Sequence, residues 1–89
     1  MLVQWTTLAS DDLSRITRRI RQDNPAAARK VAQTLFDGGM SLETMPHRGR
    51  SGRIPGTREF VIVPFILVYR IEADAVEILR IYHSAQDWP

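Results

Sequence analysis

Residues 57–83 decide the fold, and they read TREFVIVPFILVYRIEADAVEILRIYH. The run is rich in Val, Ile, Phe and Tyr, which favour β-strands, and it is interrupted at Pro64 and again at residues 72–74. Connections this short join only antiparallel neighbours, so we predict a three-stranded meander. The predicted strands are residues 57–63, 65–71 and 75–82.

The N-terminal half begins with a short strand and continues with helical spacing. Residues 2–5 are apolar and β-prone, and Thr6 or Thr7 then offers a helix N-cap, with Ser10 as a second candidate. An apolar stripe at spacings of three and four follows the cap and indicates a helix. Its members are Leu13, Ile16 and Ile20. We place Asp11 and Asp12 in the first turn of this helix, where the helix dipole favours negative charge.

Asn24 and Pro25 predict the end of this helix and the start of a second one, because Asn caps helices and Pro suits the first helical position. Apolar residues keep helical phase to Met45, and we expect Pro46 to end the helix. The pair Gly38-Gly39 costs about 2 kcal/mol of helix propensity, so we expect a weak point or kink there. Two helices with so short a link form an antiparallel hairpin.

The predicted order is β-α-α-β-β-β, an α+β domain in which the helical hairpin packs on a mainly antiparallel four-stranded sheet. Both faces of the strands are apolar, so the hairpin covers one face, and the other is left for a partner, a ligand or the tail at residues 84–89. A chain of 89 residues builds one core, so we treat residues 1–89 as a single domain.

The composition limits the cellular compartments and the kinds of catalytic or cofactor site that we expect. The chain has no cysteine, which fits a reducing compartment. Its most apolar stretch, residues 60–69, is too short to span a bilayer, and residues 1–5 lack the features of a signal peptide. We therefore expect a cytoplasmic protein without membrane contact. No metal-ligand spacing, serine-hydrolase elbow or phosphate-binding Gly-Lys-Ser/Thr loop occurs, so we expect no metal and no cofactor.

Positive charge is supplied almost entirely by arginine, since Lys30 is the one lysine among twelve cationic residues. One arginine cluster lies in the first helix, at residues 15–21. A second lies in the Gly- and Pro-rich loop of residues 46–56, which we expect to be flexible. Cationic loops of small residues bind phosphates, so Arg48, Arg50 and Arg53 are predicted nucleic-acid contacts, with a merely solvated loop as the alternative.

Arg58 and Arg80 stand on apolar strand faces. Arg58 alternates in phase with Phe60, and Arg80 with Ile78 and Tyr82. A buried arginine needs an anionic partner, so the first interpretation is a phosphate clamp on the open face of the sheet. The alternative is an ion pair within the chain or a position at the sheet margin. The acidic candidates are Glu59, Glu72 and Glu77.

Two histidines and two tryptophans complete the set of candidate functional residues. His83 follows the last strand and has the chemistry of a general acid or base, although a structural role is the alternative. His47 lies in the basic loop, where we expect it to be solvated. Trp5 and Trp88 are interpreted as core or tail anchors rather than as stacking platforms for bases.

Several segments resemble the RelE/ParE family of toxins. The resemblance rests on PHRGR at 46–50, PGTREFV at 55–61, LVYR at 67–70 and VEILRIYHSAQDW at 76–88. In the N-terminal half it rests on Ala9, Asp12-Leu13, Ile16 and DNPAAA at 23–28. It covers nearly the whole chain, and the family fold has the same element order as the one derived above.

The resemblance implies the toxin of a bacterial type II toxin–antitoxin module, which stops growth when it is free of its cognate antitoxin. One branch of the family cleaves mRNA on the ribosome, and another poisons DNA gyrase without known catalysis. For a metal-independent endoribonuclease (an mRNA interferase), the family pattern assigns charge stabilisation to Arg58 and Arg80 and proton transfer to His83 or Tyr82.

The sequence departs from well-known RNase members in two respects. They carry lysines where this chain has only arginine, and they often end with a catalytic tyrosine, whereas no Tyr follows His83. Residues 84–89 are more similar to the tails of ParE-like members. We favour the ribosome-dependent mRNA endonuclease, with a ParE-like gyrase poison as the alternative. A non-toxic nucleic-acid-binding module is a further alternative.

Overall fold

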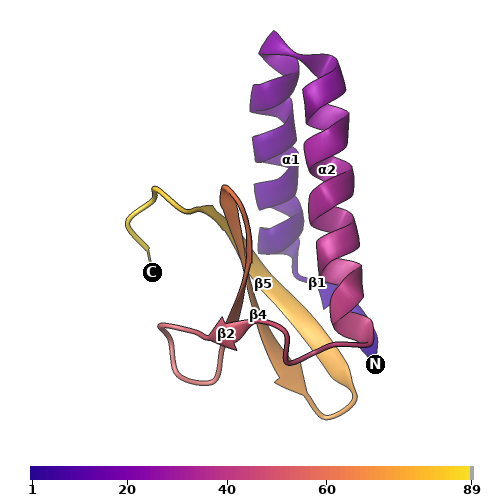
Figure 1. Cartoon of the computed structure of the whole chain (residues 1–89), viewed down its shortest axis with the longest axis vertical. Coiled ribbons are helices and arrows are strands. Elements are labelled where there is room, and N and C mark those ends of the chain that lie inside the picture. The colour runs from indigo at the N-terminus through magenta and orange to yellow at the C-terminus, as the bar shows by residue number, and fades with distance from the viewer. Residues whose placement is uncertain (89) are drawn as a thin grey trace.

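The computed structural model describes residues 1–88 and contains two helices, a short 3-10 turn and five strands (Figure 1). The elements are β1 (Leu2–Trp5), α1 (Thr7–Asp23), α2 (Pro25–Met40), the 3-10 turn η1 (Ser41–Glu43), β2 (Arg50–Ser51), β3 (Arg58–Ile62), β4 (Phe65–Glu72) and β5 (Ala75–His83). Neither helix of these residues has the length and apolarity that a bilayer crossing requires.

The strands form one sheet in the order β1-β5-β4-β3-β2. β1 runs parallel to β5, and all other neighbours are antiparallel, so the predicted α+β architecture and the meander are confirmed. The sheet has five strands rather than the predicted four, because Arg50–Ser51, in the predicted loop, pairs with Arg58 and Glu59 of β3. Two polar residues carry no alternation of hydrophobicity, so this strand has no signal in the sequence.

The start of α1 corrects one expectation. The Thr6 side chain caps the helix by accepting a hydrogen bond from the Ala9 N–H at 3.1 Å, as one of the predicted caps. Because α1 begins at Thr7, Asp11 and Asp12 lie in its second turn, and its first turn holds no acidic residue. The interpretation of the two aspartates as charges that favour the helix start is therefore wrong.

The predicted helical hairpin is confirmed, and Asn24 forms its corner. The Asn24 N–H donates to the Ile20 carbonyl at 2.8 Å, and its side-chain oxygen accepts from the Ala27 N–H at 3.0 Å. Pro25 is the first residue of α2, as expected. α2 passes through Gly38 and Gly39 but ends at Met40, where the 3-10 turn takes over, rather than at Pro46.

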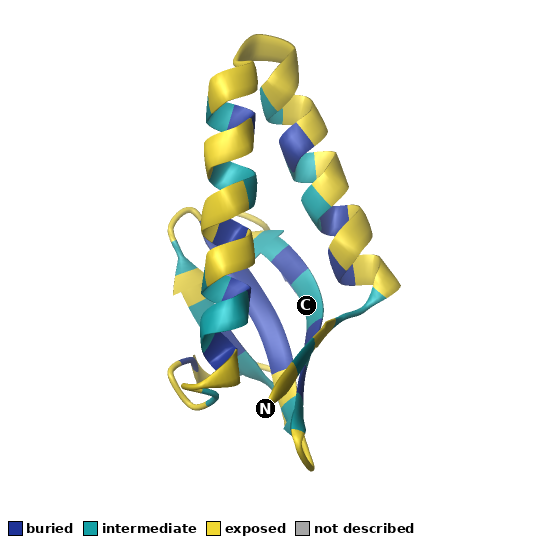
Figure 2. Cartoon of the chain, turned by 90° about the vertical axis from the view of Figure 1, so that its right-hand side faces the viewer, coloured by how far each residue is buried: buried dark blue, intermediate teal, exposed yellow. Residues whose placement is uncertain are grey.

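Apolar side chains cover both faces of the sheet. The larger core lies between the sheet and the hairpin, as the buried residues in Figure 2 show. Its members include Ala9, Leu35, Leu42, Leu67, Tyr69, Val76 and Ile78. On the other side, here named the open face, Ile66 and Val68 pack against Trp88 from the C-terminal tail. Trp88 also stacks on Tyr82, with ring centroids 4.4 Å apart, so both tryptophans anchor structure as interpreted.

The backbone of α2 approaches the sheet most closely at Gly39. A Cβ atom at this position would lie 2.6 Å from Cζ2 of Trp5 and 2.8 Å from Cδ1 of Ile78. Alanine favours helices over glycine by about 1 kcal/mol, but an overpacked core costs about 1–3 kcal/mol. We expect Gly39→Ala to lower the free energy of unfolding by up to about 2 kcal/mol in urea titrations, which is the overpacking cost less the propensity gain.

Gly38→Ala is the matched control for this change. A Cβ atom there would meet chiefly the end of the Ile62 side chain, which can rotate away at the margin of the core. We expect the control to cost less than Gly39→Ala. If the two variants unfold at the same urea concentration, close packing does not explain the glycine at position 39.

Candidate functional site

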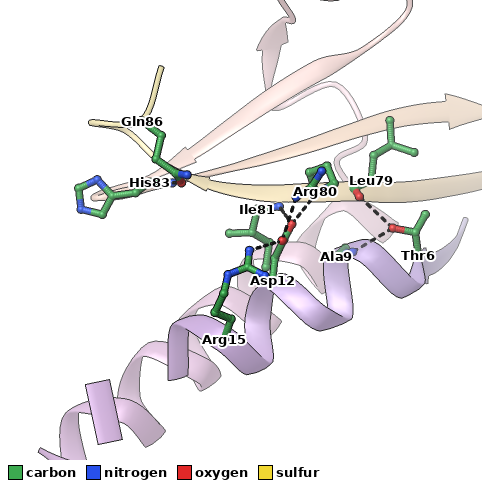
Figure 3. A network of polar contacts seen from close by, with 9 residues as sticks. All are labelled: Thr6, Ala9, Asp12, Arg15, Leu79, Arg80, Ile81, His83 and Gln86. Atoms are coloured by element: carbon green, nitrogen blue, oxygen red, sulfur yellow. Dashed lines mark hydrogen bonds and ion pairs between the residues drawn. The ribbon is translucent and has the colours of Figure 1, made fainter. Parts of the chain in front are cut away.

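Asp12 occupies the edge of β5 that no strand covers. β1 pairs with β5 only from Ala75 to Ile78, and beyond that point α1 lies along the edge. Asp12 Oδ2 accepts a hydrogen bond from the Ile81 N–H at 2.9 Å, the bond that a longer β1 would otherwise make (Figure 3). The side chain is only 1% exposed, so a carboxylate replaces a strand in the interior of the fold.

The same carboxylate binds two arginines. Arg80 donates from Nε to Oδ2 at 2.8 Å and from Nη2 to Oδ1 at 3.1 Å, and Arg15 Nη2 donates to Oδ1 at 2.6 Å. Burial raises the pKa of Asp12, but the hydrogen bonds from Arg80, Ile81 and Arg15 outweigh it and hold that pKa below its ordinary value. The pairing also raises the pKa of Arg80. The ion-pair alternative for Arg80 is therefore realised, with an acid that the strand pattern did not suggest.

A register shift in β5 changes which face Arg80 occupies. Tyr69 of β4 pairs with Ile78, but Val68 pairs with Arg80, so one extra β5 residue lies between them. Ile78 belongs to the core beneath the helices, whereas Arg80 lies on the open face with its guanidinium carbon 5.2 Å from the centre of the Tyr82 ring. The expectation that Arg80 shares a face with Ile78 is wrong, because strict alternation fails at a bulge.

Arg80 and Tyr82 border a hollow of about 520 Å³ on the open face. Trp88 forms another wall of the hollow, and the Pro55-Gly56 turn lies at its rim. This open-face hollow therefore brings together two of the four predicted catalytic side chains. One of them is neutralised by Asp12, and the other is stacked on a tail residue.

Arg58 lies elsewhere and is bound to the backbone of the predicted loop. It stands opposite Tyr69 in the β3–β4 register, and its Nη2 donates to the carbonyls of His47, at 3.1 Å, and Gly49. The Tyr69 hydroxyl donates to the Pro46 carbonyl at 2.7 Å and accepts from the Gly49 N–H at 3.0 Å. Arg58 does not line the open-face hollow, so the two sheet arginines do not form one clamp.

Glu59 holds the next part of the loop. Its side chain is 1% exposed and accepts from Arg50 Nη2 at 3.0 Å and from the Arg53 backbone N–H at 3.0 Å. Burial raises the pKa of Glu59, but these hydrogen bonds outweigh it and lower the pKa below its ordinary value. A buried carboxylate thus fixes both arginines at the base of the loop.

The remaining contacts of the loop arginines also lie within the chain. Arg53 Nη1 donates to the Trp88 carbonyl at 2.7 Å, and Arg48 Nη1 donates to Ser41 Oγ at 2.8 Å. The Arg48 guanidinium also lies over the Phe60 ring at 4.3 Å. The loop that the sequence predicted to be flexible is therefore attached to the sheet, the helix end and the tail. Its role in phosphate binding stays a prediction.

His83 lies on the helix side of β5, away from Arg80. Its ring meets Phe65 edge-on at 5.7 Å between centroids, and its Nδ1 accepts from the Ala85 N–H at 3.0 Å. Figure 3 shows the ring turned away from the Asp12–Arg80 cluster. His83 borders a second hollow of about 520 Å³, here named the α1 groove. The groove is lined by Arg15, Ile16, Arg19, Ile20, Phe65, Ile81, His83 and Gln86.

The four predicted catalytic residues thus lie in three places: beneath the loop, on the open face and beside the α1 groove. Sequence reasoning missed the importance of Asp12, for which a signal existed. Asp12 follows Ala9 by three residues and precedes Ile16 by four, so it continues the buried stripe of α1 rather than its polar side. Within residues 1–88, no group of three or more metal-ligating side chains is gathered in one place.

Comparison with known proteins places this fold in a family. Residues 3–88 match the family of ParE toxins of type II toxin–antitoxin systems of the parDE kind. Y4kP of Sinorhizobium fredii, a toxin candidate by name, is 40% identical over 98% of this chain and 92% of its own. Toxin RelE2 of Caulobacter vibrioides is 38% identical over 94% of this chain and 96% of its own.

A solved structure agrees with the sequence relatives. The chromosomal ParDE toxin–antitoxin system of Pseudomonas aeruginosa contains a chain that superposes with a TM-score of 0.85 at 27% identity, covering 93% of this chain and 95% of that one. The chain therefore belongs to the RelE/ParE family of type II toxins, as the resemblance of its motifs indicated.

The Asp12 cluster gives a testable pH dependence. A carboxyl whose pKa is lowered on folding stabilises the protein above its ordinary pKa, and this contribution is lost as the pH falls through the folded-state pKa. We expect Asp12→Asn to lower the free energy of unfolding at pH 7 by about 2 kcal/mol, less than for a fully buried pair because both arginines are partly exposed.

Below about pH 4 the wild type should lose stability more steeply than Asp12→Asn, so the two urea midpoints converge. The neighbouring exposed Asp11 supplies the control, and we expect Asp11→Asn to stay within about 0.5 kcal/mol of the wild type. Parallel pH profiles for the wild type and Asp12→Asn would contradict the assignment.

Proposed function

We propose that this toxin, when free of its antitoxin, inhibits growth by binding its target rather than by cutting RNA, and that the target is DNA gyrase. The observation that carries the proposal is the separation of Arg80 from His83. Val68 pairs with Arg80, and Phe65 pairs with His83, and these two β4 side chains pack on opposite faces of the sheet.

The separation matters because RNA cleavage without a metal needs several groups at one phosphate. A base must take the 2′-hydroxyl proton, an acid must protonate the leaving oxygen, and a cation must stabilise the charge, each within about 3 Å of its atom. Because His83 and Arg80 lie on opposite faces of the sheet, we expect a phosphate bound on either face to meet only one of them. Arg58 is committed to loop carbonyls and lies at neither hollow.

The family match and one solved structure support the same branch, whereas the relative named RelE2 does not separate the branches. The matching family is described by the parDE toxin, and the chain of the ParDE system superposes along almost the whole length. The match to the ParE family also extends through the tail as far as residue 88. A toxin that acts by binding needs an exposed, rigid surface, and the attached loop with its three arginines offers one.

A ribosome-dependent endonuclease is the second candidate, and one observation favours it. Arg80 and Tyr82 border the same open-face hollow, so a phosphate there would meet a guanidinium and a phenol. In that case Arg48, Arg50 and Arg53 would bind flanking phosphates of the message. The hollow would then have to admit RNA beside Trp88, which now covers part of the face.

Induction of the wild type and of His83→Ala in cells separates the two candidates. We expect His83→Ala to remain fully toxic, DNA synthesis to stop before protein synthesis, and gyrase-dependent DNA breaks to accumulate while ribosome-bound message stays intact. His47→Ala serves as the control for loss of an exposed imidazole. Cleaved message, together with a loss of about 10²-fold or more in His83→Ala or Arg80→Ala, would instead establish the endonuclease.

We further propose that the cognate antitoxin docks in the α1 groove. Its floor is apolar, with Ile16, Ile20 and Ile81, and its rim carries Arg15 and Arg19. An amphipathic segment with acidic residues beside its apolar face fits this combination. Such a segment would cover His83 and brace the long helical hairpin.

Reversal of one charge at the rim of the groove tests whether the antitoxin docks there. We expect Arg19→Glu to weaken binding of the antitoxin encoded beside the toxin by about tenfold, because a like charge then faces its acidic residues. Lys30→Glu makes the same charge change on α2, away from the groove. Titration calorimetry at about 0.3 M salt screens long-range effects, so the control should bind like the wild type. Equal losses in both variants would place the antitoxin elsewhere.

A further inference from the structure

The far end of the helical hairpin holds most of the unpaired positive charge of the molecule. Residues 18–30 contain five of the twelve Lys+Arg residues and one of the ten Asp+Glu residues, so this segment carries +4. The rest of the chain, with seven cationic and nine acidic residues, carries −2. Figure 1 shows this end of α1 and α2 projecting past the sheet.

The cationic residues inside and outside this segment also differ in their side-chain hydrogen bonds. Each of the seven arginines outside the segment donates a side-chain hydrogen bond to an acceptor in the chain. The five cations of the segment are exposed, and none forms a side-chain hydrogen bond or ion pair with residues 1–88. They are Arg18, Arg19, Arg21, Arg29 and Lys30.

Helix electrostatics explains only part of this arrangement. Arg21 lies in the last turn of α1, where the helix dipole favours a cation. Arg29 and Lys30 lie in the second turn of α2, beyond the first turn in which the helix dipole acts, so the dipole does not account for them. Exposed cations with no partner among residues 1–88 are available to bind a ligand from outside the fold.

The surface of the segment distinguishes between classes of ligand. A protein interface has an apolar or aromatic centre, whereas an interface with nucleic acid is polar and strongly positive. Apart from Ile20, which lines the α1 groove, no large hydrophobic side chain lies at the surface between residues 18 and 30. Guanidinium groups also match phosphate geometry, and four of the five cations are arginines.

We propose that the hairpin end, residues 18–30, binds the phosphate backbone of nucleic acid without sequence preference. The site goes beyond the proposed function, because it requires neither catalysis nor the antitoxin. It would hold the toxin on the nucleic acid that accompanies its target. The shared ligand chemistry is a run of phosphates, from DNA or from RNA.

The test measures binding of the full-length toxin to a short random-sequence DNA duplex and to oligouridylate RNA, by fluorescence anisotropy between about 50 and 200 mM salt. The variant Arg18→Gln/Arg21→Gln/Arg29→Gln removes three contacts. Each phosphate contact contributes about 0.9 to the salt slope on duplex and about 0.7 on single strands. We expect the slope to fall by about 2–3 and affinity at low salt to fall at least tenfold.

The control is Arg15→Gln/Arg70→Gln, which removes two charges from exposed arginines that already have partners in the chain and that lie outside the loop of residues 46–56. Its slope should fall by less than about 1. Binding to the duplex alone would identify DNA as the ligand, and binding to the single strand alone would identify RNA. The proposal fails if the wild type binds neither probe, if the hairpin variant keeps the wild-type slope, or if the control loses as much.

Discussion

The arrangement of the chain depends on one buried carboxylate. β1 is too short to cover β5, and the uncovered edge would leave the Ile81 N–H unpaired beneath a helix. An unpaired buried donor costs about 1–3 kcal/mol, and Asp12 removes that cost by accepting its hydrogen bond. The carboxylate in turn needs cations, and Arg80 and Arg15 supply them. The two carboxylate oxygens of Asp12 thus join α1 to the edge of β5 and to Arg80 on the open face.

A similar arrangement holds the loop. Glu59 is buried beneath Arg50 and the Arg53 backbone, and Tyr69 ties Pro46 and Gly49 to the centre of β4. In both places an acid in the interior fixes arginines that would otherwise be free to bind anions. The arginine-rich composition therefore has two meanings in this protein. Toward the sheet, arginine is a structural element, and at the end of the hairpin it is solvated charge.

The sequence predicted the fold well because its strongest signals are periodic. The break at Pro64, the Asn24-Pro25 corner and the helical stripe of α1 each reflect local physics, and each has its counterpart in the structure. What escaped prediction depends on tertiary contact. β2 is two polar residues that become a strand only because β3 is beside them. The register shift near Arg80 moves side chains between faces, and no alternation rule can locate it.

The candidate site was less predictable than the fold for the same reason. Which arginines are free depends on which acids are buried, and burial of Asp12 and Glu59 follows from packing between distant segments. The sequence suggests Arg58, Arg80 and His83 as candidate functional residues, and their roles stay a prediction. Only the three-dimensional structure shows that these residues lie in three separate places. The helical spacing of Asp12 from Ala9 and Ile16 indicates burial. Its position near the N-cap favoured the simpler interpretation as a charge at the helix start.

The pairing of β1 with β5 has a consequence for synthesis of the protein. β1 and β5, the first and last strands of the described chain, lie side by side, and two of the partners of Asp12, Arg80 and Ile81, belong to β5. A nascent chain therefore cannot close its sheet or bury that carboxylate until β5 has been translated. Contacts of such long sequence separation slow folding. β1 and α1 thus lack their sheet partner until residues 75–83 have been made, which leaves an interval in which another chain can meet them first.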